Sequence, residues 1–183
     1  MIHSIDALDH AIEAFVVVHR TPFLSSIFTS LTNFGDARII TVLSIAVALV
    51  FWRHKLLSEK AGFALALFGS LLSSYVIKII VQRPRPPIAD HLIQINDFSF
   101  PSMHAAVSVA VYGYLAYAIF KHLHPTHHRM PVIIFLSIFA ALIGISRIYL
   151  GVHYLSDVLV GYIFGAIWLA LGIWLSRTLS FRS

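Results

Sequence analysis

The sequence predicts an all-α fold: an integral-membrane helical bundle with five transmembrane helices, or six if one N-terminal segment also crosses. Hydrophobic residues make up 58% of the chain, above the roughly 45–50% that is usual in soluble domains. The mean hydropathy is +0.84, and only 11% of the residues are charged. Five apolar segments have about the 17–25 residues that cross a hydrocarbon core. Residues 1–183 have the size of one domain, so we expect a single membrane domain.

The five expected spans follow one another along the chain. They run at about Ala37–Trp52, Ala61–Val81, Ser102–Phe120, Pro131–Ile145 and Tyr154–Leu175. The first and the fourth are short, and we expect them to extend into their flanks.

Residues 1–35 are expected to form interfacial or re-entrant helices. Apolar residues at helical spacing, mixed with acids, predict an interfacial amphipathic helix over residues 5–19. Residues 22–34 carry serines and threonines among Phe and Leu and are expected to dip into the bilayer. A continuous span over residues 11–34 would bury Arg20 near its middle, which is costly, so five spans are preferred to six. Residues 1–20 lack the pattern of a cleaved signal peptide.

Basic residues predict the orientation of the bundle. Seven of them lie on one side: Arg53, Lys55, Lys60, Lys121, Arg129, Arg177 and Arg182. The other side carries two, Arg20 and Arg38, when the cations of the polar clusters described below are set aside. The positive-inside rule then places the loops at 53–60 and 121–130 in the cytoplasm.

Composition excludes several kinds of site. The chain has no cysteine, which rules out disulfides and thiolate metal sites. Its net charge of +5 comes without a long basic run, so a nucleic-acid partner is not expected. The histidine-rich loop Lys121–Arg129 is interpreted as a solvated turn, with a metal site as the alternative. The sequence leaves the oligomeric state open.

Three cations lie where the second expected span gives way to a loop. Lys78 is about one turn from the end of that span, and Arg83 and Arg85 follow it. Prolines at positions 84, 86 and 87 stop the helix there. Snorkelling at a membrane boundary is the alternative, and it explains one or two such cations. Three within eight positions favour an anion site.

A helix start follows at the head of the third span. Pro101 suits the first helical turn, and Ser99 or Ser102 can cap it. Free backbone N–H groups and the helix dipole at such an end favour a bound phosphate. His104 lies in the same first turn. Taken alone, this segment is an ordinary helix start with a structural histidine.

The third cluster joins the fourth and fifth spans. Arg147 precedes a tight turn at Gly151, and His153 and Asp157 are four residues apart and share a helix face. The carboxylate can fix the imidazole tautomer there and leave the other ring nitrogen free as a nucleophile. A buried His–Asp pair that locks a helix end is the alternative, but an acid in an apolar span indicates function.

Helix counting brings the three clusters to one side. The second span ends at the first cluster, the third begins at the second cluster, and two further crossings return the chain to the third. Cations, two histidines and one acid on one face predict a site that binds and transfers a phosphate. The excess of basic residues on the other side places this face outside the cytoplasm.

The three clusters together resemble the type 2 phosphatidic acid phosphatase (PAP2) superfamily. The matching pattern is Lys78-x6-Arg85-Pro86, Pro101-Ser102-x-His104 and Ser146-Arg147-x5-His153-x3-Asp157. The resemblance covers roughly residues 60–160, which we expect to be the catalytic core.

The resemblance implies a role for each matching residue. His153 attacks phosphorus and forms a phosphohistidine, Asp157 orients His153, and His104 protonates the leaving oxygen and then activates water. The residues that hold the phosphoryl oxygens are Lys78, Arg85, Ser102 and Arg147.

Two positions depart from the pattern or add to it. Met103 stands where the family usually has glycine, whose backbone approaches the phosphate closely. Arg83 is an extra cation whose role the sequence leaves open, with a second phosphate or a lipid headgroup as candidate ligands. The chain lacks a dense carboxylate cluster near these motifs, so we expect hydrolysis without a metal or other cofactor.

The expected function is that of a lipid phosphatase of the bacterial inner membrane with its site facing outward. Undecaprenyl diphosphate is the favoured substrate, and phosphatidylglycerophosphate and phosphatidic acid come next. A lipid phosphotransferase of the same fold, a transporter of anions or lipids and a catalytically silent scaffold are the alternatives. The charges gather at one face instead of recurring through the bilayer depth, which disfavours transport.

Overall fold

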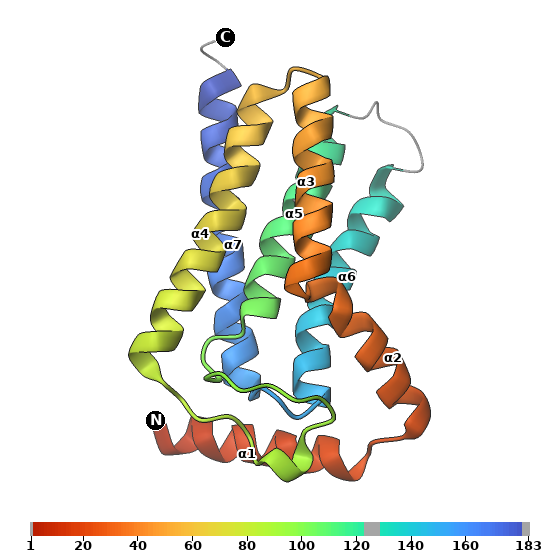
Figure 1. Ribbon diagram of the computed structural model, residues 1–183, viewed down its shortest axis with the longest axis vertical. Coiled ribbons are helices and arrows are strands. Elements are labelled where there is room, and N and C mark those ends of the chain that lie inside the picture. Colours follow the sequence, from red (N-terminus) through yellow and green to blue (C-terminus); the bar gives the residue numbers. More distant parts are fainter. Residues whose placement is uncertain (1, 123–128, 181–183) are drawn as a thin grey trace.

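Seven α-helices and two short 3-10 helices make up the part of the chain that the computed structural model describes, residues 2–122 and 129–180. They are α1 (Ile2–Val18), α2 (Pro22–Thr32), η1 (Asn33–Gly35), α3 (Ala37–Arg53), α4 (Leu57–Val81), η2 (Ile88–Asp90), α5 (Met103–His122), α6 (Arg129–Tyr149) and α7 (Leu155–Ser180). Figure 1 shows α3 to α7 as a bundle of upright helices, with α1 lying across one end. Three histidines of the histidine-rich loop and Arg182 lie outside the described residues.

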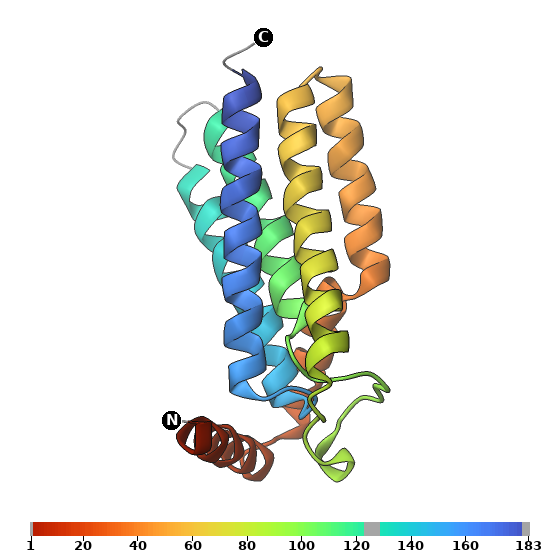
Figure 2. The ribbon, with the colours of Figure 1, turned by 90° about the vertical axis from the view of Figure 1, so that its left-hand side faces the viewer.

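α5 is the central helix of the bundle. Of its most apolar stretch, 56% is buried inside the protein, against 22–33% for α4, α6 and α7. α5 packs against all three of these helices, and α7 also packs along α4 (Figure 2). Alanines 105, 106 and 110 of α5 are completely buried. Small side chains of this kind let membrane helices approach closely.

The expected spans agree with the observed helices. α4, α5, α6 and α7 are each long and apolar enough to cross a membrane. α2 and η1 together form a bent pair with α3, at an angle of 48°, and this pair counts as a fifth span if it crosses as one unit. The predicted helical membrane bundle is therefore confirmed with four spans among the described residues, and the expected first span corresponds to the bent pair, which makes a fifth only if it crosses as one unit.

The N-terminal helices are joined to the bundle by polar contacts. Arg20, between α1 and α2, donates a 3.0 Å hydrogen bond to the carbonyl oxygen of Tyr149 and a 2.7 Å bond to that of Asp90. Asp9 of α1 is only 2% exposed. α1 therefore docks on the loops at the end of the bundle, which its amphipathic pattern alone does not predict.

A buried polar network closes the opposite end of the bundle. Glu59 of α4 is 1% exposed and accepts hydrogen bonds from Lys121 at 2.6 Å and from Ser176 at 2.7 Å. Tyr114 donates to the same carboxylate at 3.2 Å. Because these partners belong to α5 and α7, Glu59 joins α4 to both of these helices.

Glycine brings α7 against the start of α5. A Cβ atom added at Gly161 would lie 2.5 Å from the carbonyl oxygen of Ser102 and 2.9 Å from the Cβ atom of Ala105. Any larger residue at this position would push the two helices apart. The close approach sets Ser102 beside the first turns of α7, where Asp157 lies, and the backbone N–H of Ser102 donates a 3.0 Å hydrogen bond to the carbonyl oxygen of Asp157.

Candidate active site

His153 lies in the turn between α6 and α7, with its two ring nitrogens in different surroundings. Its Nδ1 is 3.4 Å from Oδ2 of Asp157, at ion-pair distance but without hydrogen-bond geometry. Its Nε2 is 3.2 Å from Nη1 of Arg85. A guanidinium only donates, so Nε2 must accept and the ring proton belongs on Nδ1, toward Asp157. Burial lowers the pKa of His153 well below its usual value, and the charges of Arg147 and Arg85 act in the same direction, so the imidazole is neutral.

Asp157 is held by several donors and is completely buried. Its Oδ1 accepts a 2.7 Å hydrogen bond from Arg83, and its Oδ2 accepts a 3.0 Å bond from the backbone N–H of Tyr154. Ser99 also donates its hydroxyl to Oδ2. A carboxylate with this many fixed donors keeps one orientation, and His153 therefore faces a fixed anion.

Lys78 and Arg85 both bind Asp97, a residue of the loop between α4 and α5. The Lys78 ammonium is 3.2 Å from Oδ2 of Asp97 and also donates to the carbonyl oxygen of Phe98. Arg85 donates through Nε to the Asp97 carbonyl oxygen at 2.8 Å and through Nη2 to Oδ1. Burial would raise the pKa of Asp97, but the hydrogen bond and charge of Arg85 and the charge of Lys78 outweigh it and hold the pKa below its usual range.

Asp97 thus occupies the two cations that the sequence assigns to phosphate. Asp97 belongs to none of the three sequence clusters. The available signal is that an acid lies close before the Ser99–His104 segment, in a loop that begins with Arg83 and Arg85. A carboxylate is an anion with planar oxygens, and it satisfies the same donors that bind phosphate.

Arg147 and Ser102 carry buried polar atoms without partners. Arg147 of α6 is 2% exposed; its Nη1 donates a 2.7 Å hydrogen bond to Oγ1 of Thr32, and its Nε has no partner among the described residues. The hydroxyl of Ser102 is buried and unpartnered in the same way. Donors left unpaired in a buried place are costly unless a ligand meets them, so both are suited to bind an anion.

His104 lies in the first turn of α5 and is partly exposed. Its electrostatic neighbours are Arg147, His153, Arg85 and Lys78. A Cβ atom added at Gly35 would lie 2.9 Å from Cδ2 of His104, so η1 forms a wall against this ring. Gly35 and Thr32 are thus site neighbours supplied by the N-terminal region, and the motifs contain no sign of either.

The two expected auxiliary residues form their contacts with other groups. Arg83 is bound to Asp9 and Asp157, on the side of Asp157 that faces α1. Met103 is partly buried and packs against the apolar core of the bundle. Neither side chain contacts Lys78, Arg85 or Arg147 among the interactions found in residues 2–122 and 129–180. Within those residues there is also no group of three or more His, Cys, Asp or Glu placed to hold a metal ion.

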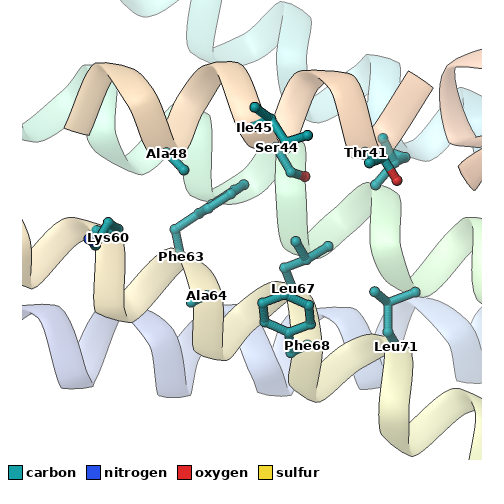
Figure 3. Close-up of a pocket in the computed structure, with 11 residues that line it drawn as sticks. Thr41, Ser44, Ile45, Ala48, Lys60, Phe63, Ala64, Leu67, Phe68 and Leu71 are labelled. Carbon is teal, nitrogen blue, oxygen red and sulfur yellow. The ribbon is translucent and has the colours of Figure 1, made fainter. Parts of the chain in front are cut away.

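An apolar groove lies between α3 and α4, separate from these polar residues. It has a volume of about 280 Å³. Figure 3 shows Phe63 and Leu67 of α4 and Ser44 and Ile45 of α3 along its walls. The groove extends along α4 to Leu71, which lies seven residues before Lys78, or about 10 Å along the helix axis. Its apolar walls suit a hydrocarbon chain.

Comparison with known proteins places this arrangement in a family. The family model of the PAP2 superfamily matches residues 59–181. Phosphatidylglycerophosphatase B of Bacillus subtilis (strain 168) is 34% identical over 167 residues, covering 89% of this chain and 80% of that protein. The putative undecaprenyl-diphosphatase YbjG of Escherichia coli (strain K12) is 29% identical over 161 residues, covering 84% and 76%.

Two solved structures share the fold. The crystal structure of a transmembrane PAP2-type phosphatidylglycerolphosphate phosphatase from Bacillus subtilis superposes with a TM-score of 0.87 and 30% identity, covering 96% of this chain and 87% of that one. LpxE of Aquifex aeolicus gives a TM-score of 0.73 at 25% identity, covering 93% and 95%. The chain therefore belongs to the PAP2 superfamily, as a membrane lipid phosphatase.

Proposed function

We propose that this protein hydrolyses a lipid phosphate in two steps through a phosphohistidine on His153. One observation carries the proposal: Nε2 of His153 is 3.2 Å from Nη1 of Arg85, a group that can only donate, while Nδ1 faces Asp157 at 3.4 Å. A neutral imidazole with its free lone pair beside a phosphate-binding cation is a nucleophile in position. The remaining polar residues of the site supply charge stabilisation, which is the main requirement of phosphoryl transfer.

In the first step, the phosphate group of the substrate takes the place of the Asp97 carboxylate on Lys78 and Arg85. Nε2 of His153 forms a bond to phosphorus as the bond to the lipid oxygen breaks. His104 enters this step as an imidazolium, which the charge of the bound phosphate favours, and gives one proton to the leaving oxygen, while the proton on Nδ1 of His153 stays beside Asp157. Arg147 and Ser102, which have unpaired buried donors, bind the equatorial oxygens of the phosphoryl group.

In the second step, water replaces the departed lipid alcohol. His104 has lost its proton and now accepts one from this water, whose oxygen bonds to phosphorus as the phosphorus–nitrogen bond breaks. Inorganic phosphate leaves, and His153 regains its neutral state with the proton on Nδ1. The two histidines thus return to their starting forms, and no cofactor takes part.

For the substrate, we place phosphatidylglycerophosphate first and undecaprenyl diphosphate second. The sequence alone favours undecaprenyl diphosphate, but the relative with 34% identity is named for the phosphatidylglycerophosphate reaction and the one named for undecaprenyl diphosphate is 29% identical. The groove between α3 and α4 supports a lipid, since its lining is almost wholly apolar and it extends toward Lys78.

A panel of lipid phosphates tests the substrate. Purified protein in detergent is given phosphatidylglycerophosphate, undecaprenyl diphosphate, phosphatidic acid and a prenyl monophosphate, and phosphate release is measured. We expect the highest kcat/KM for phosphatidylglycerophosphate, by about tenfold, which corresponds to about 1.4 kcal/mol of transition-state binding. A higher kcat/KM for undecaprenyl diphosphate would reverse the order and restore the expectation from the sequence.

We also propose that the site faces away from the cytoplasm. Arg53 ends α3, Arg177 lies in the last turn of α7, and both are at the end of the bundle opposite to α1 and the candidate site (Figure 1). The positive-inside rule places that basic end in the cytoplasm. Reporter fusions after Arg129 and after Asp90 test this orientation, and a periplasmic signal from the fusion after Arg129 would reverse it.

A further inference from the structure

We propose that Asp9 of α1 and Arg83 act together as positioning residues, which hold Asp157 and, through it, His153. This inference rests on the proposed role of His153. It gives the N-terminal helix a part in the reaction, and it assigns Arg83 a role other than the binding of a second phosphate or a lipid headgroup.

The contacts form a chain from α1 to the site. Oδ2 of Asp9 is 2.9 Å from Nη2 of Arg83, and Nη1 of Arg83 is 2.7 Å from Oδ1 of Asp157. Asp157 in turn faces Nδ1 of His153 at 3.4 Å through its other oxygen. Both terminal nitrogens of Arg83 are therefore bound to carboxylates, which leaves neither of them to a substrate phosphate.

Asp9 is built into this arrangement and is not a surface acid. Its residue exposure is 2%, although its neighbours on α1 are largely exposed. Its Oδ1 accepts a 2.9 Å hydrogen bond from the backbone N–H of Ser156, in the first turn of α7, and its Oδ2 accepts from the Ser156 hydroxyl. The carboxylate thus satisfies a free donor at the start of the helix that carries Asp157.

Arg83 is fixed from further sides. Its Nη1 also donates to the Ser156 hydroxyl at 2.7 Å, and its Cζ lies 4.3 Å from the centre of the Tyr154 ring, a cation–π distance. Its carbonyl oxygen accepts a 2.8 Å hydrogen bond from the backbone N–H of Ser99, whose side chain donates to Asp157. A planar guanidinium held this way occupies Oδ1 of Asp157 and leaves Oδ2 toward His153.

The charges around the pair determine what each substitution does. The carboxylates that act on Arg83 are Asp9 and Asp157, and Asp6, 3.6 Å away, is exposed and screened. The charged groups that act on His153 are Asp157, Arg147 and Arg85. Weaker electrostatic interactions link His104 to His153 and Lys78 to Asp157. Tyr154 interacts in the same way with the charged groups around it, which are Glu13, Asp9, Arg83 and Asp157. Among the described residues, Arg83 is the only lysine or arginine with a side-chain nitrogen within 4.0 Å of the Asp157 carboxylate. Its loss therefore leaves the negative charge of Asp157 without a close cation.

Opposite shifts in pH dependence follow from this charge order. Without the Arg83 charge, Asp157 favours the protonated form of His153, and the acid limb of kcat/KM moves to higher pH. Without the Asp9 charge, Arg83 is less neutralised, Asp157 favours the imidazolium less, and the acid limb moves to lower pH. A loss of packing alone would not move the limb in opposite directions.

Four variants of the full-length protein in detergent test the inference: Arg83→Gln, Arg83→Lys, Asp9→Asn and Asp6→Asn. Asp6→Asn is the matched control, because Asp6 is on the same helix and 3.6 Å from Arg83 but its side chain is 52% exposed. For each variant we measure kcat, KM, the pH profile, inhibition by vanadate and the rate at which radiolabelled phosphate is transferred to the protein.

Arg83→Gln should lower kcat by about 10- to 100-fold, as expected for a misplaced reacting group. Its KM and vanadate inhibition constant should stay within about twofold of the parent values, and the acid limb of kcat/KM should move to higher pH. Arg83→Lys should restore part of kcat. Asp9→Asn should lower kcat less and shift the acid limb downward. Asp6→Asn should match the parent protein.

Three outcomes would overturn the inference. A raised KM and weaker vanadate inhibition with unchanged kcat in Arg83→Gln would make Arg83 a substrate ligand. Lower activity of both variants without opposite pH shifts would reduce the pair to a structural role. An unchanged rate of radiolabel transfer to the protein in Arg83→Gln would show that Asp9 and Arg83 do not influence the reaction of His153. If the parent protein itself takes up no label, the proposed phosphohistidine is contradicted. This result distinguishes a failure of the proposed mechanism from a failure of the positioning role.

Discussion

Arg147 donates a 2.7 Å hydrogen bond through Nη1 to the hydroxyl of Thr32, a neutral partner. The guanidinium is 2% exposed, and none of the ion pairs within residues 2–122 and 129–180 includes it. A buried cation without a carboxylate costs several kcal/mol. Such a group reduces the free energy of unfolding and is expected only where an anionic ligand uses it.

Replacing this cation should therefore make the protein more stable and much less active. Arg147→Met keeps the length of the side chain and removes the buried charge, so Tm should rise by a few degrees while kcat/KM falls by about 10²–10³-fold, the usual cost of removing one transition-state donor. Vanadate should raise the Tm of the parent protein but not that of the variant. Arg38→Met, at an exposed position of α3, is the control and should change neither property. A variant less stable than the parent would show that neutral partners such as Thr32 stabilise Arg147 by more than the burial of its charge costs.

Gly35 controls the position of the His104 ring. A Cβ atom there would lie 2.7 Å from Cγ2 of Ile143 and 2.9 Å from Cδ2 of His104. Gly35→Ala should displace the ring by a few tenths of an ångström or more and lower kcat by about 10- to 100-fold at nearly unchanged KM. Gly113→Ala is the matched control, since its Cβ would meet the mobile end of Leu169 at 2.6 Å. Equal kcat in the two variants would show that Gly35 does not position His104.

Asp97 is bound to Lys78 and Arg85, so we expect it to compete with the substrate phosphate for these two cations. Asp97→Asn keeps the shape of the side chain and removes the charge that these cations bind, so the phosphate group displaces a weaker partner. Because the Asp97 side chain is 52% exposed, screening limits the effect, and we expect KM and the vanadate inhibition constant to fall by about two- to fivefold with kcat unchanged. Asp90→Asn, in the same loop, should leave both constants alone. A higher KM in Asp97→Asn would mean that the carboxylate helps to arrange the cations instead of occupying them.

Glu59 should affect stability without affecting catalysis. Glu59→Gln removes the charge that Lys121 and His122 bind at the end of the bundle away from the site. The loss of these bonds should lower the free energy of unfolding by about 1–3 kcal/mol and Tm by several degrees. The kcat of the folded protein should remain that of the parent below the transition. A fall in kcat at constant Tm would show coupling between the two ends of the bundle.

The sequence predicts the helices well because each is long and apolar. The expected spans at Ala61–Val81 and Ser102–Phe120 correspond to α4 (Leu57–Val81) and α5 (Met103–His122) within a few residues. Helix counting also brings Lys78, Arg85 and His153 to one end, where the structure joins them through contacts of Arg85 and Asp97. Both results depend on hydrophobic length, which a single sequence displays directly.

Other parts of the site are invisible in the sequence because they depend on three-dimensional packing. Asp97 is a single acid in an irregular loop, and no local pattern ties it to Lys78. Gly35 and Thr32 belong to a polar segment whose contact with His104 and Arg147 depends on the bend between α2 and α3. Asp9 has the spacing of an exposed acid on an amphipathic helix, and only the docking of α1 buries it.

The proposed phosphohistidine is tested most directly by trapping it. The protein is mixed with radiolabelled p-nitrophenyl phosphate, quenched in alkali within milliseconds, and the label bound to the protein is counted before and after acid treatment. A phosphorus–nitrogen bond survives alkali and is broken by acid. We predict acid-labile label in the parent protein, more of it in His104→Ala, whose second step lacks a base, and none in His153→Ala. Label or turnover retained by His153→Ala would contradict the assignment of His153.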